Sequence, residues 1–295
     1  IGLSPGDFHG PEDLPEIPLL EKDDIRAAGE SMISDEYRVK DLRVNLTSGS
    51  SGLPLKIYES REAARRNFIL RWTRCRPGVH RKSRRCTFTG IDIINPNQNR
   101  PPYWRMNYAS NQRIYSVFHM SEQTMGTYVS DLARFKPELI YGYPSALYIL
   151  GDFMLHHDLS LGYQPTCLVT SSEQCLPEYK KVAERAFGAK QWDEYGQGER
   201  VGLAFPCPCG LMHEVPEYAY MEFIPTGERT EDGRPLSEIV GTSFVSDAWP
   251  LIRYRTGDMV VIDPELGCSL GRPGRIIASV EGRTAQFVVT ADGAR

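Results

Sequence analysis

The alternation of strand and helix patterns between residues 138 and 199 constrains the fold of this chain more than any other feature. Short apolar segments at 138–141, 167–170 and 191–195 alternate with helical patterns that begin at Pro144 and Pro177. Proline suits the first position of a helix, because the N–H that it lacks has no helical partner there. Strand–helix–strand units pair their strands in parallel, so this order predicts an α/β fold with a parallel sheet.

Polar segments directly follow two of these expected strands. The segment from Ser171 to Glu173 follows residues 167–170, and the segment from Gly196 to Glu199 follows residues 191–195. Parallel sheets bind their ligands at the carboxyl ends of the strands. Both segments are therefore candidates for ligand binding.

A loop of residues 47–54 lies between two strand-like segments near the N-terminus. Glycine permits tight turns and a close approach of the backbone to a ligand, and successive N–H groups can form a concavity that binds anions. The loop lacks the Gly-Lys-Ser/Thr ending of the common phosphate-binding loop. We interpret it as a binding site for the terminal phosphates of a nucleotide; a flexible turn or linker is the alternative. Its hydroxyl and glycine residues are Thr47, Ser48, Gly49, Ser50, Ser51 and Gly52.

After residue 215 the patterns are those of strands alone. Segments at 218–224, 238–244, 259–262 and 275–280 predict a strand-rich subdomain. We expect residues 254–258, Tyr-Arg-Thr-Gly-Asp, to form the turn before the third of these strands.

The composition excludes several classes of protein. Of the 295 residues, 41% are hydrophobic and 24% are charged, as in soluble globular proteins, and no apolar run is long enough to span a membrane. A net charge of −4 gives no general attraction to nucleic acid. Seven cysteines, an odd number, argue against a disulfide scaffold and favour a cytoplasmic location. The chain begins with Ile and shows no signal peptide, so we take it as a fragment of a longer chain.

Taken in order, these segments resemble the signatures of the adenylate-forming superfamily. Within it, the chain resembles the phenylacetate–CoA ligase family and its CapK-like relatives. The matching segments span nearly the whole chain, and as an ordered set they are specific. They are residues 47–54, 136–145, 193–199, 250–258 and 282–283.

The resemblance implies the activity and the domain organisation. A carboxylate would attack the α-phosphate of ATP to give an acyl-adenylate and pyrophosphate, and a thiol, usually that of coenzyme A, would then capture the acyl group. The chain would be the large domain of such an enzyme. Residues 1–214 would form α/β subdomains that bind nucleotide and acyl group, 215–281 a β-rich subdomain, and 282–295 the hinge and the start of a small C-terminal domain.

The resemblance also implies a role for individual residues. Residues 47–52 would hold the β- and γ-phosphates, and Glu199 would bind magnesium, so that Thr47 and Glu199 serve catalysis directly. Asp258 would accept hydrogen bonds from the ribose, and Arg283 would lie near the ribose and phosphates. The adenine slot and its surroundings would consist of Ser171, Ser172, Glu173, Asp193, Tyr195 and Gly196.

Each of these residues has an ordinary alternative. Asp258 and the Ser171–Ser172 pair are also typical turn residues, and Glu199 is also typical of a protein surface next to Arg200.

The chain departs from the family pattern at three places. Gln197 and Gly198 stand where relatives commonly have a small or hydroxyl residue, which puts a phosphate contact there in doubt. Ala285 and Gln286 replace an acidic hinge residue. The lysine that relatives bring from the small C-terminal domain would lie beyond this chain.

Cysteine and histidine side chains gather in a short segment just before the strand-rich region. Cys207, Cys209 and His213 lie within seven residues, and Cys268 follows later. Three thiolates and one imidazole suit a tetrahedral structural zinc site, and some members of the resembled family carry a zinc near the nucleotide cleft. The alternative is reduced cysteines in a loop and a core Cys268.

We therefore expect an ATP-dependent ligase that activates an aryl or acyl acid, with the acid between residues 118–119 and 141–145, beside Ser171. His119 would position the acid, and a packing role for this histidine is an equal alternative. Two other functions stay open. One is an adenylyltransferase that passes AMP to a phenol or phosphate acceptor, and the other is a nucleotide-binding protein without catalysis. A homodimer also stays open.

Overall fold

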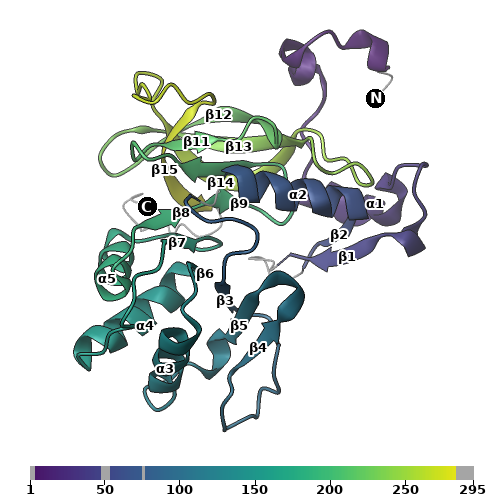
Figure 1. Ribbon diagram of the computed structural model, residues 1–295. Coiled ribbons are helices and arrows are strands. Elements are labelled where there is room, and N and C mark those ends of the chain that lie inside the picture. Colours follow the sequence, from purple (N-terminus) through teal and green to yellow (C-terminus); the bar gives the residue numbers. More distant parts are fainter. Residues whose placement is uncertain (1–3, 48–53, 75–76, 284–295) are drawn as a thin grey trace, which may run out of the picture. The chain divides into compact units, whose positions relative to one another are not determined.

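The computed structural model describes residues 4–47, 54–74 and 77–283, and the chain divides into two units (Figure 1). The inner unit comprises residues 71–194, and the terminal unit comprises residues 1–70 and 195–295. Ser48, Gly49, Ser50, Ser51 and Gly52 of the expected phosphate loop, and Ala285 and Gln286 of the expected hinge, lie outside the described residues.

The inner unit has the parallel sheet that the sequence predicts. Its described part forms a six-stranded sheet in the order β4-β5-β3-β6-β7-β8, in which β4 alone runs antiparallel to its neighbour. The strands are β3 Arg85–Thr89, β4 Trp104–Asn107, β5 Gln112–Ser116, β6 Leu139–Gly142, β7 Cys167–Thr170 and β8 Gln191–Asp193. The α/β fold class is thus confirmed for this part of the chain.

The helices of the inner unit follow the strands in the expected alternation. They are α3 Met125–Phe135, α4 Pro144–His156 and α5 Pro177–Phe187, with the short 3-10 helices η5 Tyr108–Ser110 and η6 Val117–His119. Pro144 and Pro177 are the first residues of α4 and α5, and Gly188 ends α5 in the left-handed conformation. Helices α4 and α5 pack side by side (Figure 1), with the ring of Tyr148 stacked on that of Tyr179 at 4.5 Å.

A buried carboxylate organises the polar part of this core. Asp131 is 1% exposed and accepts hydrogen bonds from Arg113 Nη1 and Arg134 Nη2, each at 2.7 Å, and from the Tyr115 hydroxyl at 2.6 Å. The Arg113 guanidinium also covers the ring of Phe135, 4.2 Å from its centre. The pair therefore joins α3 to β5 inside the core, where an ionised carboxylate requires both a positive partner and hydrogen bonds.

The terminal unit contains the strand-rich region. Its described part forms an antiparallel seven-stranded sheet in the order β12-β13-β14-β15-β11-β10-β9, and a separate hairpin of β1 and β2. The strands are β1 Arg43–Leu46, β2 Lys56–Glu59, β9 Tyr195–Gly196, β10 Leu203–Pro206, β11 Met212–Glu214, β12 Ala219–Arg229, β13 Pro235–Ser243, β14 Tyr254–Ile262 and β15 Ile276–Arg283. The helices are η1 Pro5–Asp7, η2 Pro11–Glu16, α1 Lys22–Ala28, η3 Gly29–Met32, η4 Val39–Asp41 and α2 Arg61–Arg74, of which α2 runs on into the inner unit.

Two expected elements differ from the structure. The apolar run 191–195 is not one strand, because Asp193 ends β8 while Tyr195 pairs with Ala204 of β10 in the other sheet. Residues 254–258 do not form a turn before a strand; they are the first half of β14. The division of the chain at residues 214 and 281 stays a prediction.

The Asp131 cluster yields a test of the inner unit. Asp131→Asn keeps the shape but removes the charge, and it leaves Arg113, whose side chain is 19% exposed, without its counter-charge. We expect the free energy of unfolding, measured by urea denaturation, to fall by about 3 kcal/mol. Arg134→Gln is the matched control, because this side chain is 76% exposed and should contribute about 1 kcal/mol or less. Equal losses in the two variants would contradict this account of the core.

Candidate functional site

Thr47 closes the hairpin that carries the expected phosphate loop. Its N–H donates to the Leu55 carbonyl at 3.0 Å, and its Oγ1 accepts from the Leu55 N–H at 3.0 Å. These two bonds extend the pairing of β1 with β2 by one step, from Leu46 and Lys56 to Thr47 and Leu55. Because Oγ1 serves Leu55 as an acceptor, the hydroxyl proton of Thr47 can donate to a ligand.

The loop that carries Glu199 crosses this hairpin. A Cβ placed on Gly198 would lie 3.3 Å from Thr47 Cγ2 and 3.7 Å from Ile57 Cδ1, so Gly198 allows a close approach that most side chains would resist. On its other side the loop lies on the sheet, because a Cβ placed on Gly241 of β13 would clash with the Val201 carbonyl. Thr47 and Glu199 thus become neighbours although they are far apart in the sequence.

Glu199 is buried rather than on the surface. It is 6% exposed, and the Tyr254 hydroxyl lies 3.4 Å from its Oε1. The next residue, Arg200, has a left-handed backbone (φ 61°) and forms an ion pair with Glu59 at the end of β2. Arg200 therefore fixes the loop to the hairpin and leaves the Glu199 carboxylate to other partners. The pKa of the Tyr254 hydroxyl is raised, mainly by burial and next by the Glu199 carboxylate, so this hydroxyl stays protonated and can donate.

Asp258 is held from two sides by residues of other strands. Tyr195 donates its hydroxyl to Oδ2 at 2.8 Å, and Arg283 Nε donates to Oδ1 at 2.9 Å. Gln197 donates in turn to the Tyr195 hydroxyl. Burial alone would lower the pKa of Arg283, but Asp258 and Glu199 raise it, so its charge persists. Asp258 is 7% exposed, and its two partners fix the direction of its carboxylate oxygens.

The remaining site residues that the sequence predicts lie in the inner unit. They gather at the carboxyl ends of β7 and β8, as expected for a parallel sheet. Ser171 Oγ lies 3.2 Å from Ser172 Oγ, Asp193 Oδ1 accepts from the Thr170 hydroxyl at 2.6 Å, and Glu173 Oε2 accepts from the Ser145 hydroxyl at 2.6 Å. Gly196 belongs to β9 of the terminal unit.

His119 lies at the end of η6, after β5. Its ring stacks on Tyr103 at 5.5 Å, and Nδ1 is 2.9 Å from Ser116 Oγ. Nε2 is buried and has no hydrogen-bond partner among the described residues. One ring nitrogen is thus fixed by Ser116 while the other is open to a ligand, an arrangement that suits a positioning role as well as packing.

The expected metal ligands form one cluster. Ligand atoms of Cys207, Cys209, His213 and Cys268 all lie within 4.8 Å of one another. Cys268 Sγ is 3.8 Å from that of Cys207 and 3.6 Å from that of Cys209. Sulfur atoms bound tetrahedrally to one zinc, each at ~2.3 Å, would be ~3.8 Å apart. The cluster therefore has the dimensions of a zinc site.

Local backbone structure builds the cluster. Cys207 follows β10 and begins a tight turn, in which Gly210 (φ 92°) donates to its carbonyl at 2.8 Å. His213 of β11 is 3% exposed, and neither ring nitrogen has a hydrogen-bond partner in the described part of the chain. Backbone N–H groups of Arg272 and Leu270 lower the pKa of the Cys268 thiol to about 6. An unpartnered buried imidazole beside a thiolate fits a metal ion better than a packing role.

Comparisons with known proteins show what the chain as a whole is similar to. CapK of Staphylococcus aureus is 24% identical, over 92% of this chain and 59% of the relative. A phenylacetate–coenzyme A ligase of Thermus thermophilus is 26% identical, over 98% of this chain and 65% of the relative. This chain is a relative of the phenylacetate–CoA ligases and CapK, within the adenylate-forming superfamily. It spans about three fifths of the length of these curated relatives. No family model matches the chain.

Solved structures show that this relative of the phenylacetate–CoA ligases has the fold of CoA ligases. A 2-hydroxyisobutyryl-CoA ligase in complex with an acyl-adenylate superposes with a TM-score of 0.72 at 18% identity, over 98% of this chain and 63% of that one. An anthranilate CoA ligase in complex with anthranoyl-AMP gives a TM-score of 0.56 at 17% identity, over 88% and 50% of the two chains. Within residues 4–47, 54–74 and 77–283, no helix is long and apolar enough to cross a bilayer.

Sequence reasoning missed some residues that shape the site. Tyr254, which contacts Glu199, was visible only as part of the 254–258 motif, and the Arg200–Glu59 pair gave no signal because its members are far apart in sequence. Spacing along the chain cannot indicate such partners; the fold of the terminal unit brings them together.

Asp193 gives a test that depends on pH. Burial raises the pKa of its carboxyl group to about 7 from 3.8, with Glu194 adding to the rise and the Thr170 hydroxyl and Lys180 opposing it. The folded protein therefore holds this proton more tightly than the unfolded chain. The stability that this provides is complete below the unfolded pKa of 3.8 and is lost as the pH rises through the folded pKa of about 7.

Asp193→Asn should remove this titration. We expect the variant to lose less unfolding free energy than the wild type between about pH 4 and pH 7, by ~1.4 kcal/mol for each unit of pKa difference. Urea denaturation across this range measures the effect, with Asp35→Asn, an exposed aspartate, as control. Identical pH profiles for the wild type and Asp193→Asn would refute the raised pKa.

Proposed function

We propose that this protein uses ATP to activate a carboxylic acid as an acyl-adenylate, with release of pyrophosphate, and that a thiol such as coenzyme A then takes the acyl group. One observation carries the proposal. Three residues from distant segments, Thr47, Glu199 and Asp258, are linked within the terminal unit. Thr47 contacts the loop of Glu199 at Gly198. Glu199 in turn contacts Tyr254, which lies on β14 together with Asp258.

The chemistry of each group suits this reaction. The attack of a carboxylate on the α-phosphate brings two anions together, so the site must offer donors and positive charge. In this proposal Asp258 accepts hydrogen bonds from the ribose hydroxyls, Arg283 places its charge near the ribose and phosphates, and residues 47–52 hold the β- and γ-phosphates. Glu199 is a buried carboxylate and hence a suitable ligand for Mg²⁺, which neutralises phosphate charge when bound.

The inner unit supplies the places for the adenine and the acid. Ser171, Ser172, Glu173 and Asp193 border the adenine in this proposal. In this proposal the acid lies against Phe118 and Tyr143. Both side chains approach Gly90, because a Cβ placed on Gly90 would be 3.2 Å from the Tyr143 hydroxyl and 3.7 Å from Phe118 Cζ. His119, with its buried Nε2, positions the carboxylate. Phenylacetate–CoA ligases among the relatives make an aryl acid the first substrate class to test.

Pyrophosphate exchange tests the proposed reaction. Purified protein should exchange labelled pyrophosphate into ATP only when magnesium and an accepted aryl or alkyl acid are present. Glu199→Gln should slow the exchange by about a hundredfold or more, because the metal loses its anionic ligand. Glu231→Gln, in an exposed turn, is the matched control and should leave the rate unchanged.

The other outcomes of this assay separate the alternatives. AMP found covalently on a phenol or phosphate acceptor would favour an adenylyltransferase. ATP binding without any acid-dependent exchange would overturn the ligase proposal in favour of a nucleotide-binding protein without catalysis.

We propose further that the three-cysteine, one-histidine cluster holds a structural zinc ion. Metal analysis should find about one zinc per chain. Cys209→Ser should lose the metal and lower the melting temperature, because a bound structural zinc stabilises the folded chain. Cys175→Ser, at a cysteine outside the cluster, should keep the metal and serves as control. A folded, active protein without zinc would overturn the proposal.

A further inference from the structure

Asp258 lies in an irregularity of the sheet. The register pairs Val240 of β13 with Arg255 and Glu238 with Met259 of β14, so residues 256–258 all lie opposite Ile239. Such a bulge bends the strand and turns a side chain out of its regular direction. Gly257 has φ 71°, a left-handed conformation that favours glycine. The bulge is thus what directs the Asp258 carboxylate toward Tyr195 and Arg283.

Polar side chains hold the bulge in place of the missing ladder bonds. Thr256 Oγ1 donates to the Ile239 carbonyl at 2.8 Å and accepts from the Asp258 N–H at 3.0 Å. The Gly257 N–H donates to Glu238 Oε1 at 3.2 Å. Side chains therefore hold the N–H groups of Gly257 and Asp258 where the regular pairing of β14 with β13 is interrupted.

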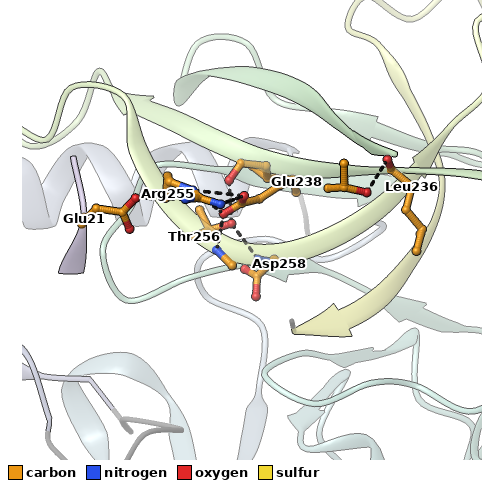
Figure 2. A network of polar contacts seen from close by, with 9 residues as sticks. Glu21, Leu236, Glu238, Arg255, Thr256 and Asp258 are labelled. Carbon is orange, nitrogen blue, oxygen red and sulfur yellow. Dashed lines mark hydrogen bonds and ion pairs between the residues drawn. The ribbon is translucent and has the colours of Figure 1, made fainter. Parts of the chain in front are cut away.

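Glu238 is the centre of this network. Figure 2 shows Arg255 between Glu21 and Glu238, with Thr256 and Asp258 beside them. Arg255 Nε lies 3.2 and 3.1 Å from the two Glu238 oxygens, and Arg255 Nη1 lies 3.0 Å from Glu21 Oε1. Glu238 is 7% exposed, so its charge requires a partner of this kind. The bulge therefore depends on a carboxylate that does not itself touch Asp258.

We propose that Glu238 is a positioning residue for ribose recognition. It holds the Gly257 N–H and, through Arg255, the strand before the bulge, and so it fixes the direction in which Asp258 presents its carboxylate. This inference rests on the proposed function, in which Asp258 accepts from the ribose hydroxyls. Its consequence is specific: loss of Glu238 should weaken the recognition of the ribose hydroxyls, not the binding of phosphates and base.

A comparison of two nucleotides distinguishes this positioning role from a general loss of folding or binding. The purified protein is titrated calorimetrically with ATP and with 2′,3′-dideoxy-ATP, which lacks both hydroxyls, in the presence of magnesium. The wild type should prefer ATP by at least about tenfold, as for hydrogen bonds to a charged group. In Glu238→Ala this preference should fall toward one, mainly through weaker ATP binding, while the affinity for dideoxy-ATP changes little.

A second Glu–Arg pair on the same sheet provides the matched control. Glu222 of β12 holds Arg253 with contacts of 3.0 and 2.9 Å and does not contact the bulge. Glu222→Ala should destabilise the fold but keep the preference for ATP. Thr256→Val removes one hydroxyl from the network and should also lower the preference for ATP. This variant provides the test if Glu238→Ala does not fold.

The outcomes distinguish the inference from the proposed function. If the wild type binds no ATP, or binds both nucleotides equally, the proposed role of Asp258 fails and the inference fails with it. If the wild type prefers ATP and Glu238→Ala or Thr256→Val retains the full preference, the inference alone is wrong. An equal loss of preference in Glu222→Ala would also overturn it, because the effect would then be a general one.

Discussion

The candidate site of the terminal unit depends on the interactions that hold the buried carboxylate of Asp258. A buried charge is costly unless it is paired and its oxygens accept hydrogen bonds. Asp258 meets both conditions through Arg283 of β15 and Tyr195 of β9, strands that lie on either side of it in sequence. The carboxylate has both partners, and thus a fixed direction, only after these strands have joined one sheet. The fold of the terminal unit and the formation of its site are therefore the same event.

The inner unit contains two buried acidic groups with contrasting surroundings. Asp131 has two guanidinium partners and a tyrosine hydroxyl, which suits a structural carboxylate. Asp193 accepts a hydrogen bond from the Thr170 hydroxyl, and burial, with Glu194 adding to it, raises the pKa of its carboxyl group to about 7 against the opposing effect of Lys180. A buried carboxyl group at a strand end whose pKa is raised in this way is typical of functional positions.

The sequence predicted the parts of this protein that depend on local pattern. The alternation of strands and helices after residue 138, the starts of α4 and α5 at proline, and the metal-ligand types in residues 207–213 are all short-range signals. The failures have a common cause. The run 191–195 looked like one strand because nothing local indicates that Tyr195 pairs with β10, and the bulge at 256–258 arises from its pairing with β13. Partners distant in the chain decide such features, and a single sequence does not display them.

The cysteine–histidine cluster and the carboxylate of Asp258 are connected through one strand. His213 pairs with Ile276, the first residue of β15, and Arg283, the last residue of β15, pairs with Asp258. In the zinc proposal, the ion fixes β11 and the turns at Cys207 and Cys268 that precede β11 and β15. It thus sets where β15 begins. The pairing of β15 with β14 has two register shifts between Ile277 and Arg283, so this start limits the position of Arg283 without fixing its register. A structural ion at one end of the strand would in this way support the acceptor geometry at the other, without contacting the nucleotide.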